Sequence, residues 1–491
     1  MSDSIPDDTL DVPSEDTVEL RKLRNSLQLV NQLPEDLLIE VLMIAKSSPL
    51  GSMEPPCIHY IHAASQVCSQ WRRICLNSPL LWACIHIETL PLSPFADLCI
   101  TRAKDVPISL SVNPSGHNNK LTVSNWKHLL RSLAARGVSM KRWRGLAIRV
   151  SDFEVFPDLL EHLVSYPTPN LEFIFCATQT RKYFAESHPN RRSSFVPLSA
   201  NQSSLLSSSL PKLRSVELKR VHLAHLFDRN PPVLLTRLTR LRLVEAGVGH
   251  YAPHAFVLLL SSQPSIEELA LNEHAYFQDG DPKSWPTISP VTFPSLRQLK
   301  LLVTDLYTIV GGMGLIWMTR FLQSIDAPGL QQLIIISPVE LSDTSIEELV
   351  DFISTGYIPN QANVNEPNPA RKLLYPVLRY LGAIFPLPKD TRLHKAESML
   401  AALPSLTHLR ILDEDVAVID RTPRCSSGLT HLFIQDLLAP KELGDILHRR
   451  QGAGFPIRVL GLRGNEDVIG LPSEVELKRY RATQAGDFLD L

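Results

Sequence analysis

The feature that most restricts the fold is a recurring pattern, Leu-x-x-Leu-x-Leu, in which other apolar residues sometimes replace a leucine. A strand directs alternate side chains to opposite faces, so the last two apolar positions share one face and the variable positions share the other. Most successive copies begin 23–34 residues apart, which predicts one strand and one helix per unit. The copies begin at Trp143, Leu171, Leu213, Leu238, Ile266, Leu296, Leu330, Leu378, Leu406, Leu429 and Ile457.

The segments between the copies are expected to form short amphipathic helices on the far side of the strands. A single unit cannot bury its own apolar face, so the units must stack into a quasi-one-dimensional array. The alternation Ile108-x-Leu110-x-Val112 predicts a first, capping strand. The expected helices cover residues 126–133, 156–164, 256–260, 315–325, 346–353, 396–403 and 443–449.

The array resembles leucine-rich-repeat proteins, which implies parallel strands on a concave face and helices on a convex face. It departs from that family because the asparagine expected three residues after the last leucine is replaced, for example by Val221 and Ala246. The unit length also varies, with a Ser-rich insertion at 191–210 and a Pro/Asn-rich insertion at 356–373. We therefore expect an α/β fold with an irregular solenoid over residues 91–464 and a C-terminal tail over 465–491.

On the concave sheet of such a solenoid the variable positions are exposed. The central variable positions of successive units are Arg149, Phe175, Glu217, Arg242, Ala270, Lys300, Ile334, Gly382, Arg410, Phe433 and Gly461. Two residues further along, Leu302, Ile336, Ile384 and Leu412 carry no charge.

These positions predict an apolar strip in the middle of the solenoid, flanked by basic residues. The hypothesis is that the strip holds a hydrophobic segment of a target protein while the basic residues attract an acidic flank. The alternative is that the insertions or the C-terminal tail cover the strip. The candidate substrate-binding residues are Arg242, Lys300, Leu302, Ile334, Ile336, Ile384, Arg410 and Leu412.

Composition describes an ordinary soluble protein with 44% apolar and 20% charged residues. The formal net charge of −2 shows no footprint of nucleic-acid binding. Seven scattered cysteines without a Cys-x-x-Cys pair favour reduced thiols, and hence the cytoplasm or the nucleus. Residues 1–19 carry seven acids and no apolar core, so we expect a disordered acidic tail instead of a secretion signal. No apolar run is long enough to span a bilayer.

The first ninety residues have a different pattern. Apolar residues from Val18 to Val30 are spaced for one side of a helix. The next segment, Leu33-Pro34-Glu35-Asp36 followed by Leu37-Leu38-Ile39-Glu40-Val41-Leu42, has a proline and acids suited to a helix start. Its apolar residues cover most of the helix circumference, so this helix is expected to pack on two sides. A second helix is expected over 58–76, closed by Ser78-Pro79-Leu80-Leu81-Trp82.

Three of these segments, LPEDLLIEVL, VCSQWRRIC and SPLLW, resemble the signatures of an F-box in the order that the family has them. The likeness covers roughly residues 27–87, and we assign residues 20–90 to an F-box with a preceding helix. The departure is a longer connection at 47–56, which is similar to insertions in fungal F-box proteins.

The resemblance implies that the helices dock on a Skp-type adaptor and, through it, on a cullin–RING ligase. The residues expected at the adaptor or in the supporting core are Leu33, Pro34, Leu37, Leu38, Val41, Val67, Cys68, Trp71 and Trp82. The alternative is a small three-helix domain without a partner. Against it stands an excess of apolar surface over what about 60 residues can bury internally.

The sequence contains few candidate motifs for catalysis or metal binding. No HExxH, GxSxG, Walker or GxGxxG motif occurs. The best metal candidate is Cys57-x-His59-x-x-His62 with Cys68 nearby, but Cys68 belongs to the F-box pattern and is expected in the core. We therefore expect neither a metal nor a cofactor.

Two functions remain from different classes. The first is a non-catalytic substrate receptor of a Skp–cullin–F-box ubiquitin ligase, which concentrates an unidentified target near a ubiquitin-charged enzyme. The second is a scaffold that binds a protein partner through the repeats without any ligase. An enzyme is the least favoured reading. Neither nucleic acid nor a membrane is expected as a partner.

Overall fold

The computed structural model divides the chain into two compact units, residues 1–111 and 112–491. It describes residues 15–46, 58–114, 121–150, 159, 163, 166–178, 210–219, 237–244, 257, 260, 263–273, 290–303, 313–336, 343–356, 374–384, 392–412, 416, 419–420, 427–435, 440–463, 468 and 470–480. No helix in these ranges is long and apolar enough to cross a membrane.

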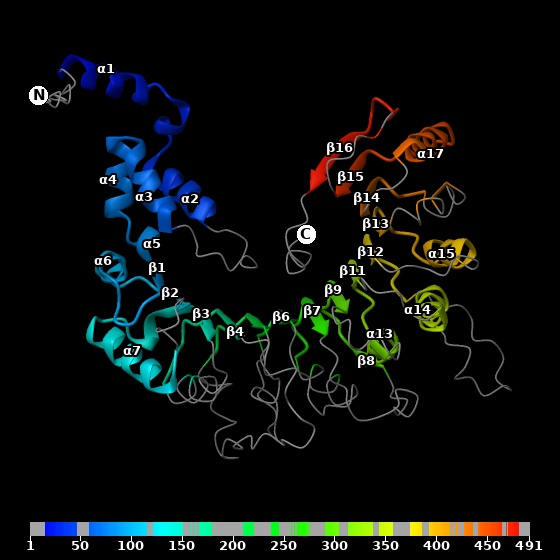
Figure 1. The fold of residues 1–491 in the computed structure, drawn as a ribbon, viewed down its shortest axis with the longest axis horizontal. Helices are drawn as coiled ribbons and strands as arrows, with labels where there is room; N and C mark the ends of the chain where they lie inside the picture. The colour runs from blue at the N-terminus through cyan, green and yellow to red at the C-terminus, as the bar shows by residue number, and fades with distance from the viewer. Residues whose placement is uncertain are drawn as a thin grey trace, which may run out of the picture. The chain divides into compact units, whose positions relative to one another are not determined.

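The first unit is mainly helical, as the blue part of the ribbon in Figure 1 shows. Its helix begins at Glu15, inside the segment expected to be a disordered tail, so that boundary was wrong. The elements are α1 (Glu15–Ser26), η1 (Leu29–Gln32), α2 (Glu35–Lys46), α3 (Ile58–Val67), α4 (Ser69–Asn77), α5 (Pro79–Trp82), β1 (Cys84–Ile87), α6 (Pro94–Ala103) and β2 (Ile108–Val112).

The single helix expected over 58–76 is two helices, because the backbone of Cys68 is extended. Cys68 caps the second helix: its Sγ accepts a hydrogen bond from the Trp71 backbone N–H at 3.5 Å. Side-chain capping satisfies an N–H group that a helix start leaves without a backbone partner. The periodicity of apolar residues runs across Cys68 without interruption, which is why spacing alone did not reveal the break.

The core of the first unit gathers apolar side chains of α2, α4 and α5. Leu38, Ile74 and Trp82 are buried there. The Trp82 indole donates to the Cys75 carbonyl at 2.6 Å, so its one polar atom is satisfied inside the core. The Arg102 guanidinium lies 4.4 Å from the centre of the Trp82 ring and closes this core from the α6 side.

The second unit contains a long parallel sheet, which confirms the α/β class and is compatible with a repeat solenoid. Its elements are α7 (Val123–Ala135), η2 (Met140–Arg142), β3 (Trp143–Val150), β4 (Phe173–Thr178), β5 (Ser215–Lys219), β6 (Arg240–Val244), β7 (Glu268–Glu273), β8 (Val291–Thr292), β9 (Gln298–Val303), α13 (Met313–Gln323), β10 (Ile325–Asp326), β11 (Gln332–Ile336), α14 (Asp343–Thr355), β12 (Tyr380–Ile384), α15 (Arg392–Ala401), β13 (His408–Leu412), β14 (His431–Gln435), α17 (Pro440–Gly452), β15 (Val459–Arg463) and β16 (Glu476–Tyr480).

The strands of this unit follow one another in chain order, from β3 to β16, except that β8 and β10 form a separate small pair. Helices α13, α14, α15 and α17 lie on one side of the row of strands in Figure 1. The first of the repeat helices, α7, shows why these segments are helical. Thr122 caps it by accepting from the Asn125 N–H, and Trp126, Leu129 and Leu133 form its buried stripe.

The strand register follows the apolar pattern. Leu299 pairs with Leu333, Leu333 with Leu381, and Leu409 with Leu432, so the leucines stack from rung to rung. All of them are buried. Stacked leucines bury the face that a single strand would leave exposed, which is the physical reason for the array.

The helices expected around α7, α13, α14, α15 and α17 are confirmed, although the one expected to reach Ile325 ends at Gln323 and Ile325 belongs to β10. Those expected over 156–164 and 256–260 lie largely outside the described residues. Strand β2 is present where a first strand was expected.

Several elements were not anticipated, among them α6, β8, β10, β1 and β16. β1 precedes the expected first strand in the chain, and β16 lies within the segment expected to be a tail. β16 pairs in parallel with β15, Leu477 beside Leu460. The sequence Val475-Glu476-Leu477-Lys478 has the alternation of a strand but lacks the full repeat pattern, so it escaped notice.

One assignment in the first rung was wrong. Arg149 was predicted to lie in the central row of variable positions with Phe175, but Ala147 pairs with Phe175 and Arg149 pairs with Ala177. The mistake shifts the position by two residues along the strand, so Arg149 still lies on the face of the variable positions but in the next row.

Candidate protein-docking surfaces

Exposed apolar side chains concentrate in the first unit. Among the described residues, every exposed large hydrophobic side chain except Tyr166 and Val377 lies between Val18 and Leu98. Scattered exposed apolar residues are ordinary on a protein surface, but a concentration of them marks an interaction surface.

Helix α2 carries the clearest part of this surface. Leu37, Val41 and Ile44 are spaced four and three residues apart, so they lie on one face of the helix, and all are exposed. Leu38 and Leu42 lie on the neighbouring face and are almost fully buried. One apolar face of this helix thus packs in the core and the other lies in solvent, and the expected packing of the second face stays a prediction.

The other residues expected at an adaptor divide in the same way. Pro34 and Val67 are exposed, whereas Leu33, Cys68 and Trp71 are partly buried. Leu38 and Trp82 are buried in the core, so they support the surface and do not contribute contact area to it. We call Pro34, Leu37, Val41 and Ile44 the exposed α2 surface; Val67 is exposed at the end of α3.

Trp71 is held in place by a polar contact. Its indole N–H donates to the Asn31 Oδ1 at 2.6 Å, and the Asn31 side-chain amide donates to the Asn25 carbonyl at 2.6 Å. These bonds connect α4 with η1 and the end of α1. Asn31 was missed in the sequence, where no spacing singles it out.

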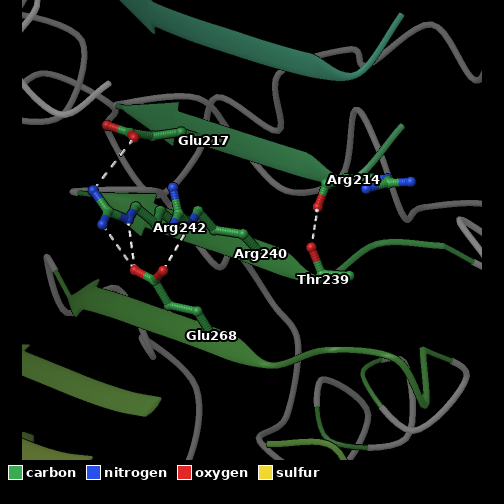
Figure 2. A network of polar contacts seen from close by, with 6 residues as sticks. All are labelled: Arg214, Glu217, Thr239, Arg240, Arg242 and Glu268. Carbon is green, nitrogen blue, oxygen red and sulfur yellow. Dashed lines mark hydrogen bonds and ion pairs between the residues drawn. The ribbon is translucent and has the colours of Figure 1, made fainter. Parts of the chain in front are cut away.

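In the second unit, the face of the variable positions carries a cluster of charges, shown in Figure 2. The Arg242 guanidinium contacts Oε1 of Glu268 at 2.8 and 2.9 Å, and Nε of Arg240 lies 2.6 Å from Oε2 of the same carboxylate. Glu217 lies 3.9 Å from Arg242 on the opposite side. Arg242 and Glu268 are both buried. The charges therefore neutralise one another within the sheet, as buried charges must.

Next to these charges lies an apolar cluster. Leu302, Ile334 and Ile336 are buried together, and Tyr380 and Leu412 pack against them. Gly382 leaves the space for this packing, because a Cβ there would lie 3.3 Å from Ile334 and 3.4 Å from the Tyr380 ring. The expected apolar strip thus exists as a packed cluster.

The exposure expected of the strip was wrong. Arg242, Lys300, Leu302, Ile334, Ile336 and Arg410 have at most 8% of their surface exposed. Leu412 is partly buried, and the Ile384 side chain lies outside the described residues. These side chains are buried in the observed conformation. Their role in substrate binding stays a prediction.

At the starts of β12, β13 and β14 this face carries partly buried aromatic side chains. They form a stack that sequence reasoning missed: Tyr380 lies on His408 with ring centres 6.1 Å apart, and His408 lies on His431 at 4.0 Å. The signal was present, because the tripeptide Thr-His-Leu occurs at both 407–409 and 430–432.

The two threonines of this tripeptide have the same role. The Thr407 hydroxyl lies 3.2 Å from the Arg379 carbonyl and 2.8 Å from Nδ1 of His408. The Thr430 hydroxyl lies 3.3 Å from the Thr407 carbonyl and 2.9 Å from Nδ1 of His431. Each threonine therefore connects its own histidine to the preceding rung.

Tyr380 has an ionisable group that stays neutral. Burial raises the pKa of its hydroxyl, and the adjacent Arg410, which shares a hydrogen bond with it, opposes that shift. Because the ordinary tyrosine pKa is already about 10, the phenol remains protonated at physiological pH.

The metal candidate gains no support. Cys57 lies outside the described residues, His62 is exposed on α3, and Cys68 caps α4. Within the described ranges, no group of three His, Cys, Asp or Glu side chains is placed to hold a metal ion.

Comparison with known proteins does not identify a family for this chain. No protein-family model matches the chain, and no curated protein matches it. Among solved structures, a protein from Bacteroides fragilis is similar with 10% identity and a TM-score of 0.31, over 72% of this chain and 82% of that one. The Rad7 and Elc1 complex of yeast is similar with 11% identity and a TM-score of 0.32, over 87% and 97%. TM-scores this low carry no inference about function.

Proposed function

We propose that this protein is the substrate-receptor subunit of a Skp–cullin–F-box type ubiquitin ligase. The first unit would dock on a Skp-type adaptor through the exposed α2 surface, and the repeat unit would recruit the target protein. The chain itself would contribute no catalytic residue. Its effect would be to raise the concentration of the target near the ubiquitin-charged enzyme.

The observation that supports the proposal most is the division of α2 into two apolar faces. A helix that belongs to an isolated domain has one buried stripe and one polar face. On α2, Leu38 and Leu42 fill the core while Leu37, Val41 and Ile44 remain exposed beside them. Burying an exposed leucine against a partner contributes on the order of 1.5–3 kcal/mol, so this row can supply the centre of an interface.

The test is co-purification of the full chain with a co-expressed Skp-type adaptor, compared with the Leu37→Asp variant. Circular dichroism should show both proteins folded, because Leu37 is exposed. The proposal predicts that the wild type retains the adaptor and that the variant does not. If the wild type is well folded but does not retain the adaptor, the ligase proposal is wrong and the repeat scaffold remains as the alternative.

A further inference from the structure

Two imidazole rings stack across neighbouring strands near the C-terminal end of the sheet. His408 begins β13 and His431 begins β14, and the two residues are paired in the strand register. Their ring centres are 4.0 Å apart, and the ring planes differ by 15°. Each Nδ1 lies within hydrogen-bonding distance of the preceding threonine hydroxyl, so each ring is held in its stacked orientation.

The groups around the pair do not offset a double positive charge. On the β12 side, His408 faces Tyr380, whose hydroxyl is hydrogen-bonded to Arg410 of β13. On the β15 side, His431 is within the electrostatic influence of Arg458, and on β16 of Lys478 and Glu476. Glu476 is itself 3.5 Å from Lys478. Its negative charge is therefore shared with a lysine.

Water reaches one end of the pair. His431 lines an open groove of about 610 Å³, whose apolar wall includes Leu447, Ile457 and Pro472 and whose polar edge includes Gln451, Arg458 and Glu474. Protons can therefore exchange with His431 without prior opening of the sheet.

The electrostatics favour neutral rings. Burial, and then the neighbouring His431, lower the pKa of His408 below its usual range. Burial first, then Lys478 and Arg458, lower the pKa of His431, and Glu476 opposes them. Both rings are therefore harder to protonate in the folded chain than in the unfolded one, where the pKa is about 6.5.

We propose that the His408–His431 pair is a pH-sensitive joint between β13 and β14, closed while both rings are neutral and opened when acid charges them. Above about pH 6.5 neither state of the chain binds the protons, and the joint is fully stable. As the pH falls below that value, His408 and His431 bind protons more readily in the open or unfolded chain than in the stacked pair. Stability is therefore lost on acidification. This inference does not depend on the proposed function.

The experiment is amide hydrogen exchange of the full chain at pH 7.5 and pH 5.0, corrected for the intrinsic pH dependence of exchange. We expect the protection of the β13 and β14 amides to fall at pH 5.0, because the opened strands take up protons that the stacked pair resists. The β4 and β5 amides, whose strands contain no histidine, serve as the internal reference and should keep their protection.

Variants distinguish the joint from general acid sensitivity. His431→Gln and, separately, His408→Gln keep a polar side chain but cannot be charged, so the loss of protection at pH 5.0 should be smaller in either variant and absent when both are combined. His394→Gln replaces an exposed histidine of α15 and should behave as the wild type. The proposal is overturned if the wild-type β13 and β14 amides are equally protected at both pH values. It is also overturned if either folded glutamine variant keeps the wild-type loss.

Discussion

Glu268 holds two arginines of the neighbouring strand at once: Oε1 contacts Arg242, and Oε2 contacts Arg240. The strand register places Arg240 directly beside Glu268, and alternation brings Arg242 to the same face two residues further on. Because Arg242 and Glu268 are buried, removing the charge of Glu268 would leave Arg242 with only the more distant Glu217, 3.9 Å away.

The Glu268→Gln variant should therefore lose about 1–3 kcal/mol of unfolding free energy, because it leaves buried Arg242 with an uncharged amide and only the more distant carboxylate of Glu217. Urea denaturation followed by circular dichroism measures this loss. Glu267→Gln, an exposed neighbour, is the control and should change stability by less than about 0.5 kcal/mol. Equal stability of the two variants would show that the charge of Glu268 does not stabilise the fold.

Gly461 leaves room for the ring of Phe433 on the adjacent strand. An added Cβ at Gly461 would overlap this ring, and the strand backbone cannot move away without breaking the ladder. Gly461→Ala should destabilise the protein by about 1–3 kcal/mol, the usual cost of overpacking. Gly452→Ala, where a Cβ meets nothing within 4 Å, should be tolerated. Thermal unfolding of the two variants measures this difference. An unchanged melting temperature of Gly461→Ala would contradict the packing described.

Cys68 acts as a helix cap, and this role predicts its substitutions. Serine places a better acceptor at the same position, so Cys68→Ser should keep or raise stability by about 0.5–1 kcal/mol. Cys68→Val removes the acceptor for the Trp71 N–H and should lower stability by about 1 kcal/mol. If Cys68→Val and Cys68→Ser have the same unfolding free energy in denaturant, the cap contributes nothing to stability.

The sequence predicts the rungs of the sheet well, because the leucine positions determine both the face and the register of a strand. Leu333, Leu381 and Leu409 were placed correctly in this way. The rule fails where the pattern is incomplete. β16 has one leucine, Leu477, in place of the full repeat, and its strand was missed.

The candidate sites were harder to predict than the rungs. Leu302 and Ile336 lie on the expected face, but their burial depends on how closely neighbouring rungs pack, which a one-dimensional pattern does not contain. The exposed row on α2 was predictable in kind, because a short helix with apolar residues around most of its circumference needs two packing surfaces. Which of Leu37 and Leu38 faces solvent depends on the tertiary packing of α2.

The most direct test of the proposed function is the affinity of the purified full chain for a Skp-type adaptor, measured by titration calorimetry with matched variants. Leu37→Asp and Val41→Asp should each weaken binding by about 100-fold or more, since burying a carboxylate at the centre of an interface costs at least about 2.7 kcal/mol. Val377→Asp, in the repeat unit, alters a side chain of similar exposure, 41% against 48% for Leu37, and should bind as the wild type. Tight wild-type binding lost only in the two α2 variants is the predicted result. Absence of binding by the folded wild type, or equal loss in Val377→Asp, would contradict it.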